Sequence, residues 1–104
     1  MEEDDVIELG GSISLNGFKD LASGSMTIIK KIVGSYAKSF SEKNTDFEGL
    51  SLTMKKVHET EGSEKYEVHA KLMLKGNPVT AEETDRNLFV VLDSVLKKVE
   101  EQVS

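Results

Sequence analysis

The strongest constraint on the fold is a run between residues 66 and 74 in which apolar and other positions alternate. Its alternate positions hold Tyr66, Val68, Ala70, Leu72 and Leu74. Successive side chains of a β-strand point to opposite faces, so this alternation predicts a strand with one buried and one open face. Such a strand needs a neighbouring strand beside it and an apolar layer over its buried face.

A second alternating run supplies the neighbouring strand. Leu50, Leu52 and Met54 alternate with polar residues, and a turn signal at 61–63 separates this run from the next. The two runs are therefore predicted to form an antiparallel hairpin.

Two shorter segments extend the predicted sheet. Residues 6–15 are apolar at intervals around Gly10 and Gly11, which indicates a first strand that carries a glycine bulge. After a turn, residues 79–82 are suited to a short fourth strand. Pro78 at its start favours an edge position, because proline cannot donate a hydrogen bond to a further strand.

Two other segments show helical spacing. The first apolar stripe consists of Met26, Ile29, Val33, Tyr36 and Phe40. The second consists of Leu88, Leu92, Val95, Val99 and Val103. Each stripe predicts an amphipathic helix. The N-cap of the first helix is predicted at Ser23 or Ser25, and that of the second at Thr84 or Asp85.

The predicted order of elements is β-α-β-β-(β)-α, where the bracketed strand is residues 79–82. This order predicts an α+β two-layer sandwich, with two helices packed on one face of an antiparallel sheet. A chain of 104 residues suits one domain, which we place at residues 6–104. Residues 1–5 are predicted to be an acidic, disordered N-terminal tail.

The chain offers little catalytic chemistry. It contains no cysteine, which excludes disulfides, thiolate nucleophiles and iron–sulfur ligation. It also contains no Gly-x-Ser-x-Gly elbow, Walker loop or Gly-x-Gly-x-x-Gly motif. We therefore expect a binding protein that is not an enzyme and has no cofactor.

Two histidines raise the question of a metal site. His58 and His69 could meet across the predicted hairpin. Oxygen ligands could come from Glu59, Glu61 or Glu67. A stable structural site usually needs about four ligands. The simpler interpretation is two surface histidines on a polar sheet face, and no metal site is predicted.

The net charge of −6 is unevenly distributed, because residues 2–5 carry four negative charges. On the first helix Lys31, Ser35 and Lys38 are spaced to lie on one stripe, with Lys30 at its margin. Lysine neutralises phosphate charge, and a serine hydroxyl can donate to a phosphate oxygen. The stripe therefore predicts a nucleic-acid-binding surface. The alternative is that these lysines only keep an exposed face solvated.

Other lysines extend the predicted surface. Lys55 lies on the predicted open face of the sheet together with Lys71 and Lys75, and Lys97 and Lys98 lie on the closing helix. No aromatic residue falls at a predicted open-face position, whereas RRM-like sheets stack bases on such aromatics. Contacts are therefore expected to the nucleic-acid backbone and not to bases.

The order and spacing of these segments resemble a known family. The alternating strand is followed by a turn, a short strand at 79–82, and a helix that reads DRNLFVVLDSVLKKVEEQV over 85–103. The first-helix stripe from Ile29 to Phe40 fits the same pattern. Over about residues 26–103 the chain resembles the ribosome-associated inhibitor and hibernation-factor family.

The resemblance implies a β-α-β-β-β-α sandwich, similar to the double-stranded-RNA-binding domain, and no catalytic residues. It implies binding to rRNA phosphates of the small ribosomal subunit, near the tRNA and mRNA sites. The matching positions are Lys30, Lys31, Lys38, Lys97 and Lys98. Three features depart from the family: the closing helix ends with Glu100 and Glu101, the stretch from Gly10 to Met26 is longer than the family's segment, and the total charge is acidic. A shared fold with a different partner stays open, because fold does not fix function.

Two hypotheses follow. The first is a cytoplasmic RNA- or ribosome-associated domain that contacts rRNA phosphates through its lysines. The second is a protein-interaction or homodimerising module that binds no nucleic acid. It is motivated by the acidic second half, by Val90 and Met73 at predicted exposed positions, and by the edge strand at 79–82. No apolar run approaches about 18 residues, so no membrane association is expected.

Overall fold

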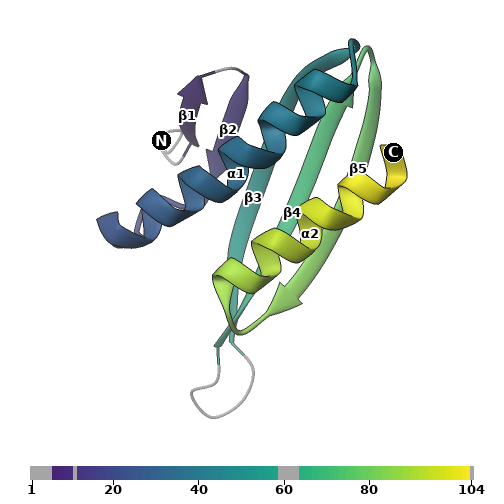
Figure 1. The fold of residues 1–104 in the computed structure, drawn as a ribbon. Helices are drawn as coiled ribbons and strands as arrows, with labels where there is room; N and C mark the ends of the chain where they lie inside the picture. The colour runs from purple at the N-terminus through teal and green to yellow at the C-terminus, as the bar shows by residue number, and fades with distance from the viewer. Residues whose placement is uncertain (1–5, 11, 59–63, 104) are drawn as a thin grey trace.

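A computed structural model describes residues 6–10, 12–58 and 64–103 of the chain (Figure 1). The elements are β1 (Val6–Gly10), β2 (Ile13–Asn16), α1 (Ser23–Lys43), β3 (Phe47–His58), β4 (Glu64–Leu74), β5 (Asn77–Asp85) and α2 (Leu88–Val103). The predicted α+β class is confirmed. The acidic segment 1–5 lies outside the described residues, so its predicted disorder stays a prediction.

The strands of the described residues form one sheet in the order β1-β2-β3-β4-β5. β1 and β2 are antiparallel, as are β3 and β4, and β4 and β5. β2 and β3 are parallel, because the chain leaves β2, passes through α1 and returns in the same direction. The prediction of an entirely antiparallel sheet is therefore wrong, and the sheet is mixed.

The predicted single strand over 6–15 is also wrong, because it is a hairpin of two strands. Val6 pairs with Asn16, and Glu8 pairs with Ser14. Gly10 has a φ of 86° and Ser12 a φ of 67°, and this left-handed backbone reverses the chain. The apolar spacing continues through the reversal, which is why it resembles one bulged strand.

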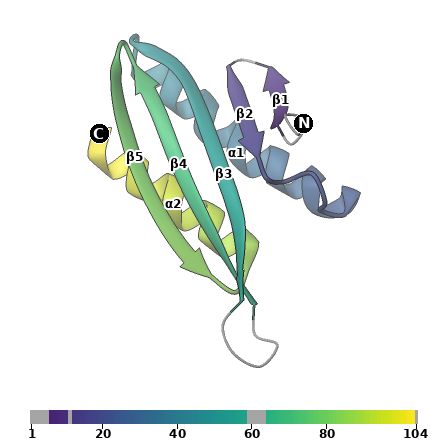
Figure 2. The same cartoon turned by 180° about the vertical axis from the view of Figure 1, so that it is seen from behind.

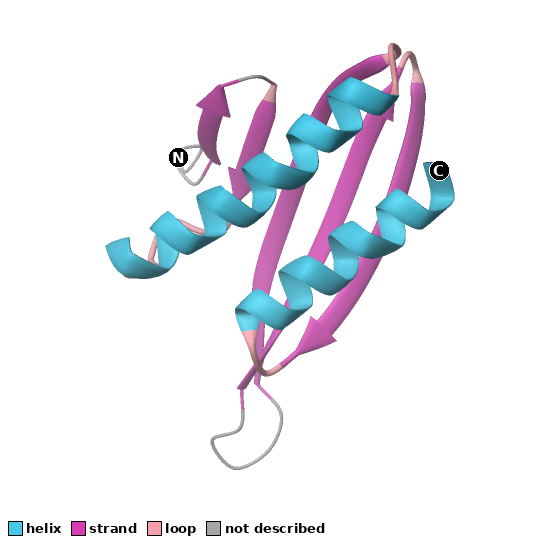
Figure 3. Cartoon of the chain, in the orientation of Figure 1, coloured by secondary structure: helices cyan, strands magenta, loops and turns pink. Residues whose placement is uncertain are grey.

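Both helices lie on the same side of the sheet, in front of it in Figure 1 and behind it in Figure 2. Figure 3 distinguishes this helical layer, in cyan, from the strands in magenta. α2 lies over β4 and β5, and α1 lies nearer to β3. Among the described residues every buried side chain is apolar. The fully enclosed centre of the core includes Leu15, Ile29, Val33, Leu50, Leu52, Val68, Leu72, Val91, Leu92, Val95, Leu96 and Val99.

The turn after β2 contributes a core residue that periodicity did not indicate. Phe18 is completely buried although it lies in neither a strand nor a helix. Gly17 precedes it with a φ of 88°, and a Cβ at this position would collide with the carbonyl oxygen of Met54. Glycine is therefore required at 17, and the close approach to β3 directs Phe18 into the core.

The helix caps differ from those predicted. α1 begins after Ala22 without a side-chain cap, and Ser23 already belongs to the helix. α2 is capped by Asn87, whose Oδ1 accepts hydrogen bonds from the backbone N–H groups of Phe89 (2.9 Å) and Val90 (3.2 Å). The predicted caps Thr84 and Asp85 are unavailable for this role because β5 extends through them.

The predicted strand at 79–82 is present and longer than expected, since β5 spans Asn77–Asp85. It lies at the edge of the sheet with Pro78 as its second residue, as the proline indicated. Neither described helix is long and apolar enough to cross a membrane.

Candidate nucleic-acid interface and the open sheet face

The first-helix residues of the predicted interface all lie on the surface of α1. Lys30, Lys31, Ser35 and Lys38 are exposed. Within the described residues, none of these three lysines forms an ion pair with a carboxylate closer than 4.0 Å. The lysine ammonium groups of this stripe are therefore free to neutralise charge on a partner. We refer to these four residues as the α1 basic stripe.

The lysines of the second helix do not join the α1 basic stripe. Lys98 Nζ lies 2.6 Å from the Glu83 carboxylate of β5, so its charge is used within the molecule. Acidic groups of α2 lie toward α1: Asp93 accepts a 2.8 Å hydrogen bond from the Tyr36 hydroxyl, and Glu100 lies 3.9 Å from Lys43 Nζ. Lys97 is exposed on α2. The carboxylates of Asp93 and Glu100 therefore separate the positive charge of Lys97 from that of the α1 basic stripe.

The position of Tyr36 between the two helices raises the pKa of its hydroxyl. Burial, followed by the hydrogen bond to Asp93 and the negative charges of Asp93 and Glu100, raises the pKa of Tyr36 to about 12. Each effect disfavours the phenolate, since it would be poorly solvated and next to carboxylates. The neutral phenol therefore joins α1 to α2 at all ordinary pH values.

Lys55 lies on the opposite side of the sheet. Its neighbours Leu52 and Met54 face the helices and are buried, so Lys55 and Thr53 face the open side. The structure does not bring Lys55 together with the α1 basic stripe. The seven predicted contact residues therefore lie on three separate surfaces.

Two adjacent hollows separate α1 from the β1–β2 hairpin. One, of about 370 Å³, is lined by Glu8, Leu9, Ile13, Lys30 and Gly34. The other, of about 430 Å³, is lined by Ile13, Gly34, Ala37, Lys38, Ser41 and Phe47. Gly34 lines both hollows, and a Cβ added there would meet no atom within 4 Å. The sequence did not indicate these hollows, because it did not indicate the hairpin.

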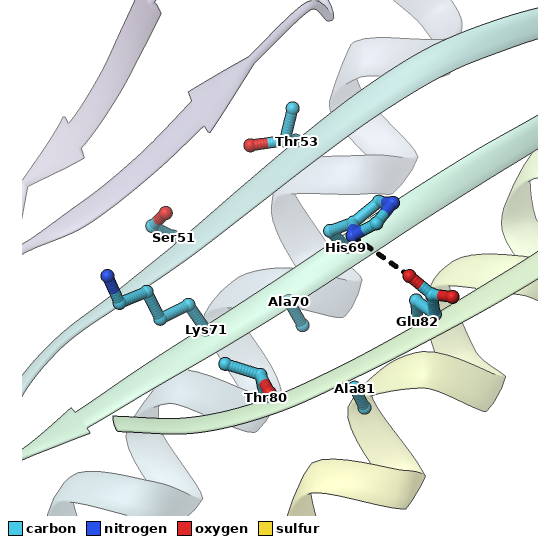
Figure 4. A pocket seen from close by; sticks show the side chains of 8 residues that line it. All are labelled: Ser51, Thr53, His69, Ala70, Lys71, Thr80, Ala81 and Glu82. Atoms are coloured by element: carbon cyan, nitrogen blue, oxygen red, sulfur yellow. Dashed lines mark ion pairs between the residues drawn. The ribbon is translucent and has the colours of Figure 1, made fainter. Parts of the chain in front are cut away.

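The open face of the sheet carries a shallow hollow of about 330 Å³ (Figure 4). Its side chains come from neighbouring strands at paired positions. Lys71 of β4 pairs with Ser51 of β3 and Thr80 of β5. The next row places His69 between Thr53 and Glu82. Six of the eight lining residues have polar side chains, as the alternation of these strands predicted, and the other two are Ala70 and Ala81.

The imidazole of His69 lies between two carboxylates. Its Nε2 is 2.6 Å from Glu67 Oε2, and its Nδ1 is 3.2 Å from Glu82 Oε1. A neutral imidazole has one N–H, so only the protonated ring can donate to both carboxylates. The hydrogen bond with His69 lowers the pKa of Glu67 in spite of partial desolvation, with help from the charges of His69 and Lys55. Glu67 is therefore ionised at neutral pH.

The two histidines do not meet across the hairpin. His58 pairs with Glu64 at the end of β3, whereas His69 pairs with Thr53. The two paired positions are five residues apart along β3, which corresponds to about 17 Å. Glu67, a predicted oxygen ligand, does lie against His69. Glu82 also meets His69, and only the register between β4 and β5 could have indicated that contact.

Comparison with known proteins adds no relative. No protein-family model matches the chain, and no curated protein matches it.

Proposed function

We propose that the protein is a non-enzymatic RNA-binding domain that contacts phosphates through the α1 basic stripe. The observation that carries this proposal is that Lys30, Lys31 and Lys38 are exposed and form no ion pair with described carboxylates. Lys98, in contrast, is paired internally with Glu83. Each lysine that neutralises a phosphate releases condensed counterions, which favours binding at low salt.

The spacing of the stripe suits a phosphate backbone. Lys31 and Lys38 are separated by about 10 Å along the helix axis. A nucleic-acid duplex carries about one charge per 1.7 Å of its axis, so this distance spans several phosphates. Ser35 lies between the two lysines and supplies a hydroxyl that can donate to a phosphate oxygen.

The arrangement of elements supports RNA as the nucleic acid. The order β2-α1-β3-β4-β5-α2 matches the β-α-β-β-β-α order that the resemblance to ribosome hibernation factors implies, with β1 as an additional strand before it. rRNA of the small ribosomal subunit is accordingly the partner we propose, with a cytoplasmic location. The fold alone does not establish this partner, so the lysines carry the proposal.

Binding to small ribosomal subunits and to a double-stranded RNA tests the proposal. The triple substitution Lys30/Lys31/Lys38→Gln should weaken binding at least about tenfold at 50 mM salt, and should reduce the slope of log K against log salt by about 2–3. The matched control Lys56/Lys71/Lys75→Gln removes the same charge from other surfaces and should change binding less than about twofold. Equal losses in the two triple variants, or no binding by the native chain, would refute the proposed interface.

The alternative of strand addition at β5 is less well supported. Two backbone carbonyls of this edge strand are already engaged by α2: Gln102 Nε2 donates to Thr80 O at 2.9 Å, and Lys98 Nζ approaches Glu82 O at 3.5 Å. Of the two apolar residues that motivated self-association, Val90 is 50% exposed, whereas Met73 is partly buried. We therefore expect a monomer in sedimentation equilibrium, and a concentration-dependent dimer would favour the alternative.

A further inference from the structure

The cluster on the open sheet face has the composition of a metal site. Glu67, His69 and Glu82 each offer one ligand atom, and these atoms lie within 4.8 Å of one another. We propose that these three residues bind one divalent transition-metal ion of the zinc type. The proposal does not depend on RNA binding, because the cluster and the α1 basic stripe lie on opposite sides of the sheet.

The strands preposition the three ligands. His69 is directly opposite Glu82 in the β4–β5 pair, and Glu67 lies two residues before His69 on the same face of β4. β4 is hydrogen-bonded on both sides, to β3 and to β5, so its backbone cannot easily shift. Little backbone order therefore remains to be gained when an ion binds.

Small side-chain movements are enough to complete the site. Zinc binds histidine nitrogen and carboxylate oxygen at about 2.0–2.2 Å, so neighbouring ligand atoms lie roughly 3.3 Å apart. His69 Nε2 and Glu67 Oε2 are already 2.6 Å apart, with a proton between them that the ion replaces. The Glu82 side chain is 67% exposed, and it can rotate from Nδ1 toward the same ion.

The ligand types select the class of ion. Imidazole suits zinc, copper, nickel and cobalt, whereas magnesium and calcium prefer sites made only of oxygen. Two ionised carboxylates and a neutral imidazole give the site two negative charges. Lys55 pairs with Glu67, and Lys71 lies two residues beyond His69. Both lysines face the same side of the sheet as the cluster, and their positive charges reduce its affinity for a cation.

The hollow of about 330 Å³ leaves the remaining coordination positions accessible to water. Its other lining groups include the hydroxyls of Thr53 and Thr80 (Figure 4). Three protein ligands and an accessible fourth position are typical of exchangeable or catalytic zinc sites, in contrast to closed structural sites with four protein ligands.

Cobalt(II) absorption and zinc titration calorimetry on the full chain test the proposal. The acids at 2–5 should be neutralised in all samples (E2Q, E3Q, D4N, D5N), so that they cannot bind cations. We expect one saturable site for Co²⁺ that Zn²⁺ displaces, with no response to Mg²⁺. Binding should weaken as the pH falls, because the imidazole must be neutral to coordinate the ion.

Substitutions in the cluster are compared with substitutions outside it. His69→Gln and Glu82→Gln should each weaken Zn²⁺ binding at least about tenfold. Glu48→Gln and His58→Gln remove the same groups from other positions and should change affinity less than about twofold. Circular dichroism should show an unchanged fold in every variant, because the cluster residues lie outside the core. The absence of saturable Co²⁺ or Zn²⁺ binding, or unchanged binding in His69→Gln, would overturn the proposal.

Discussion

The two helices of the protein differ in how they use their surfaces. α2 buries Leu88, Val91, Leu92, Val95, Leu96 and Val99 within 16 residues. α1 has 21 residues and buries only Ile29, Val33, Ala37 and Phe40. Polar side chains of α2 also contact β5, through Lys98 and Gln102. α1 has hollows on the side that faces the β1–β2 hairpin.

The difference indicates which surface groups have no partner among the described residues. Near α2, Lys98 and Gln102 contact Glu83 and the carbonyls of Glu82 and Thr80, and these contacts add to the stability of the chain. On α1 three lysines have no described carboxylate partner, and an apolar hollow lies beside one of them, Lys38. Interactions that folding does not use are available to a partner, and this is the physical basis for placing the interface on α1.

The largest expected effect compares the two helices in the core. Leu92→Ala in α2 should reduce the free energy of unfolding by about 3–4 kcal/mol, and Ile29→Ala in α1 by about 2 kcal/mol. Both side chains are fully buried, but α1 lies less closely on the sheet and can settle into the space left behind. Urea unfolding measures both values. Equal costs, or a greater cost at Ile29, would contradict the difference in packing.

A smaller effect is expected where the two helices meet. Tyr36→Phe removes the hydrogen bond to Asp93 and should cost about 1 kcal/mol, because the pair is partly solvated. The raised pKa of Tyr36 gives the native chain a stability contribution that is complete below pH 10 and is lost as the pH rises toward about 12. The difference in stability between native and Tyr36→Phe proteins should therefore shrink over this range.

The measurement is urea unfolding at several alkaline pH values, in a Tyr66→Phe background so that one phenol titrates. Absorbance of the phenolate in the same samples reports the pKa directly. A constant difference between the two proteins from pH 9 to pH 12 would show that the hydrogen bond does not couple to ionisation.

The smallest expected effect concerns β5, the edge strand whose Thr80 and Glu82 carbonyls are contacted by α2. Gln102→Ala frees the carbonyl of Thr80 and should cost about 0.5 kcal/mol, because that carbonyl can bond to water instead. Glu101→Ala, one residue away and exposed, is the matched control and should change stability less. If α2 does protect β5, Gln102→Ala should also increase self-association measured by light scattering. Unchanged scattering would show that Gln102 does not protect β5 from self-association.

Local periodicity was sufficient to predict most elements of the fold. The alternation at Leu50–Met54 and Tyr66–Leu74 and the helical stripes correspond to β3, β4, α1 and α2. The hairpin within residues 6–16 was missed because its turn lies at Gly10 and Ser12, where alternation does not change phase. The cap at Asn87 was missed because β5 extends further than the pattern of its residues indicates.

The candidate site was predictable only in part. The α1 basic stripe follows from spacing along one helix, and its residues are exposed as expected. Alternation correctly placed Lys55 on the open face of the sheet. Spacing could not show that Lys98 is neutralised by Glu83, because that ion pair depends on how α2 packs on β5.

The sequence by itself determined which side chains each helix and strand would turn inward, because that choice depends on a period of two or about 3.6 residues along the chain. Only the tertiary structure decided which polar groups would meet. The Tyr36–Asp93 hydrogen bond joins residues 57 positions apart, and the cluster around His69 requires Glu82 to lie directly opposite on β5. Such contacts depend on the register and packing between elements, which no local pattern records.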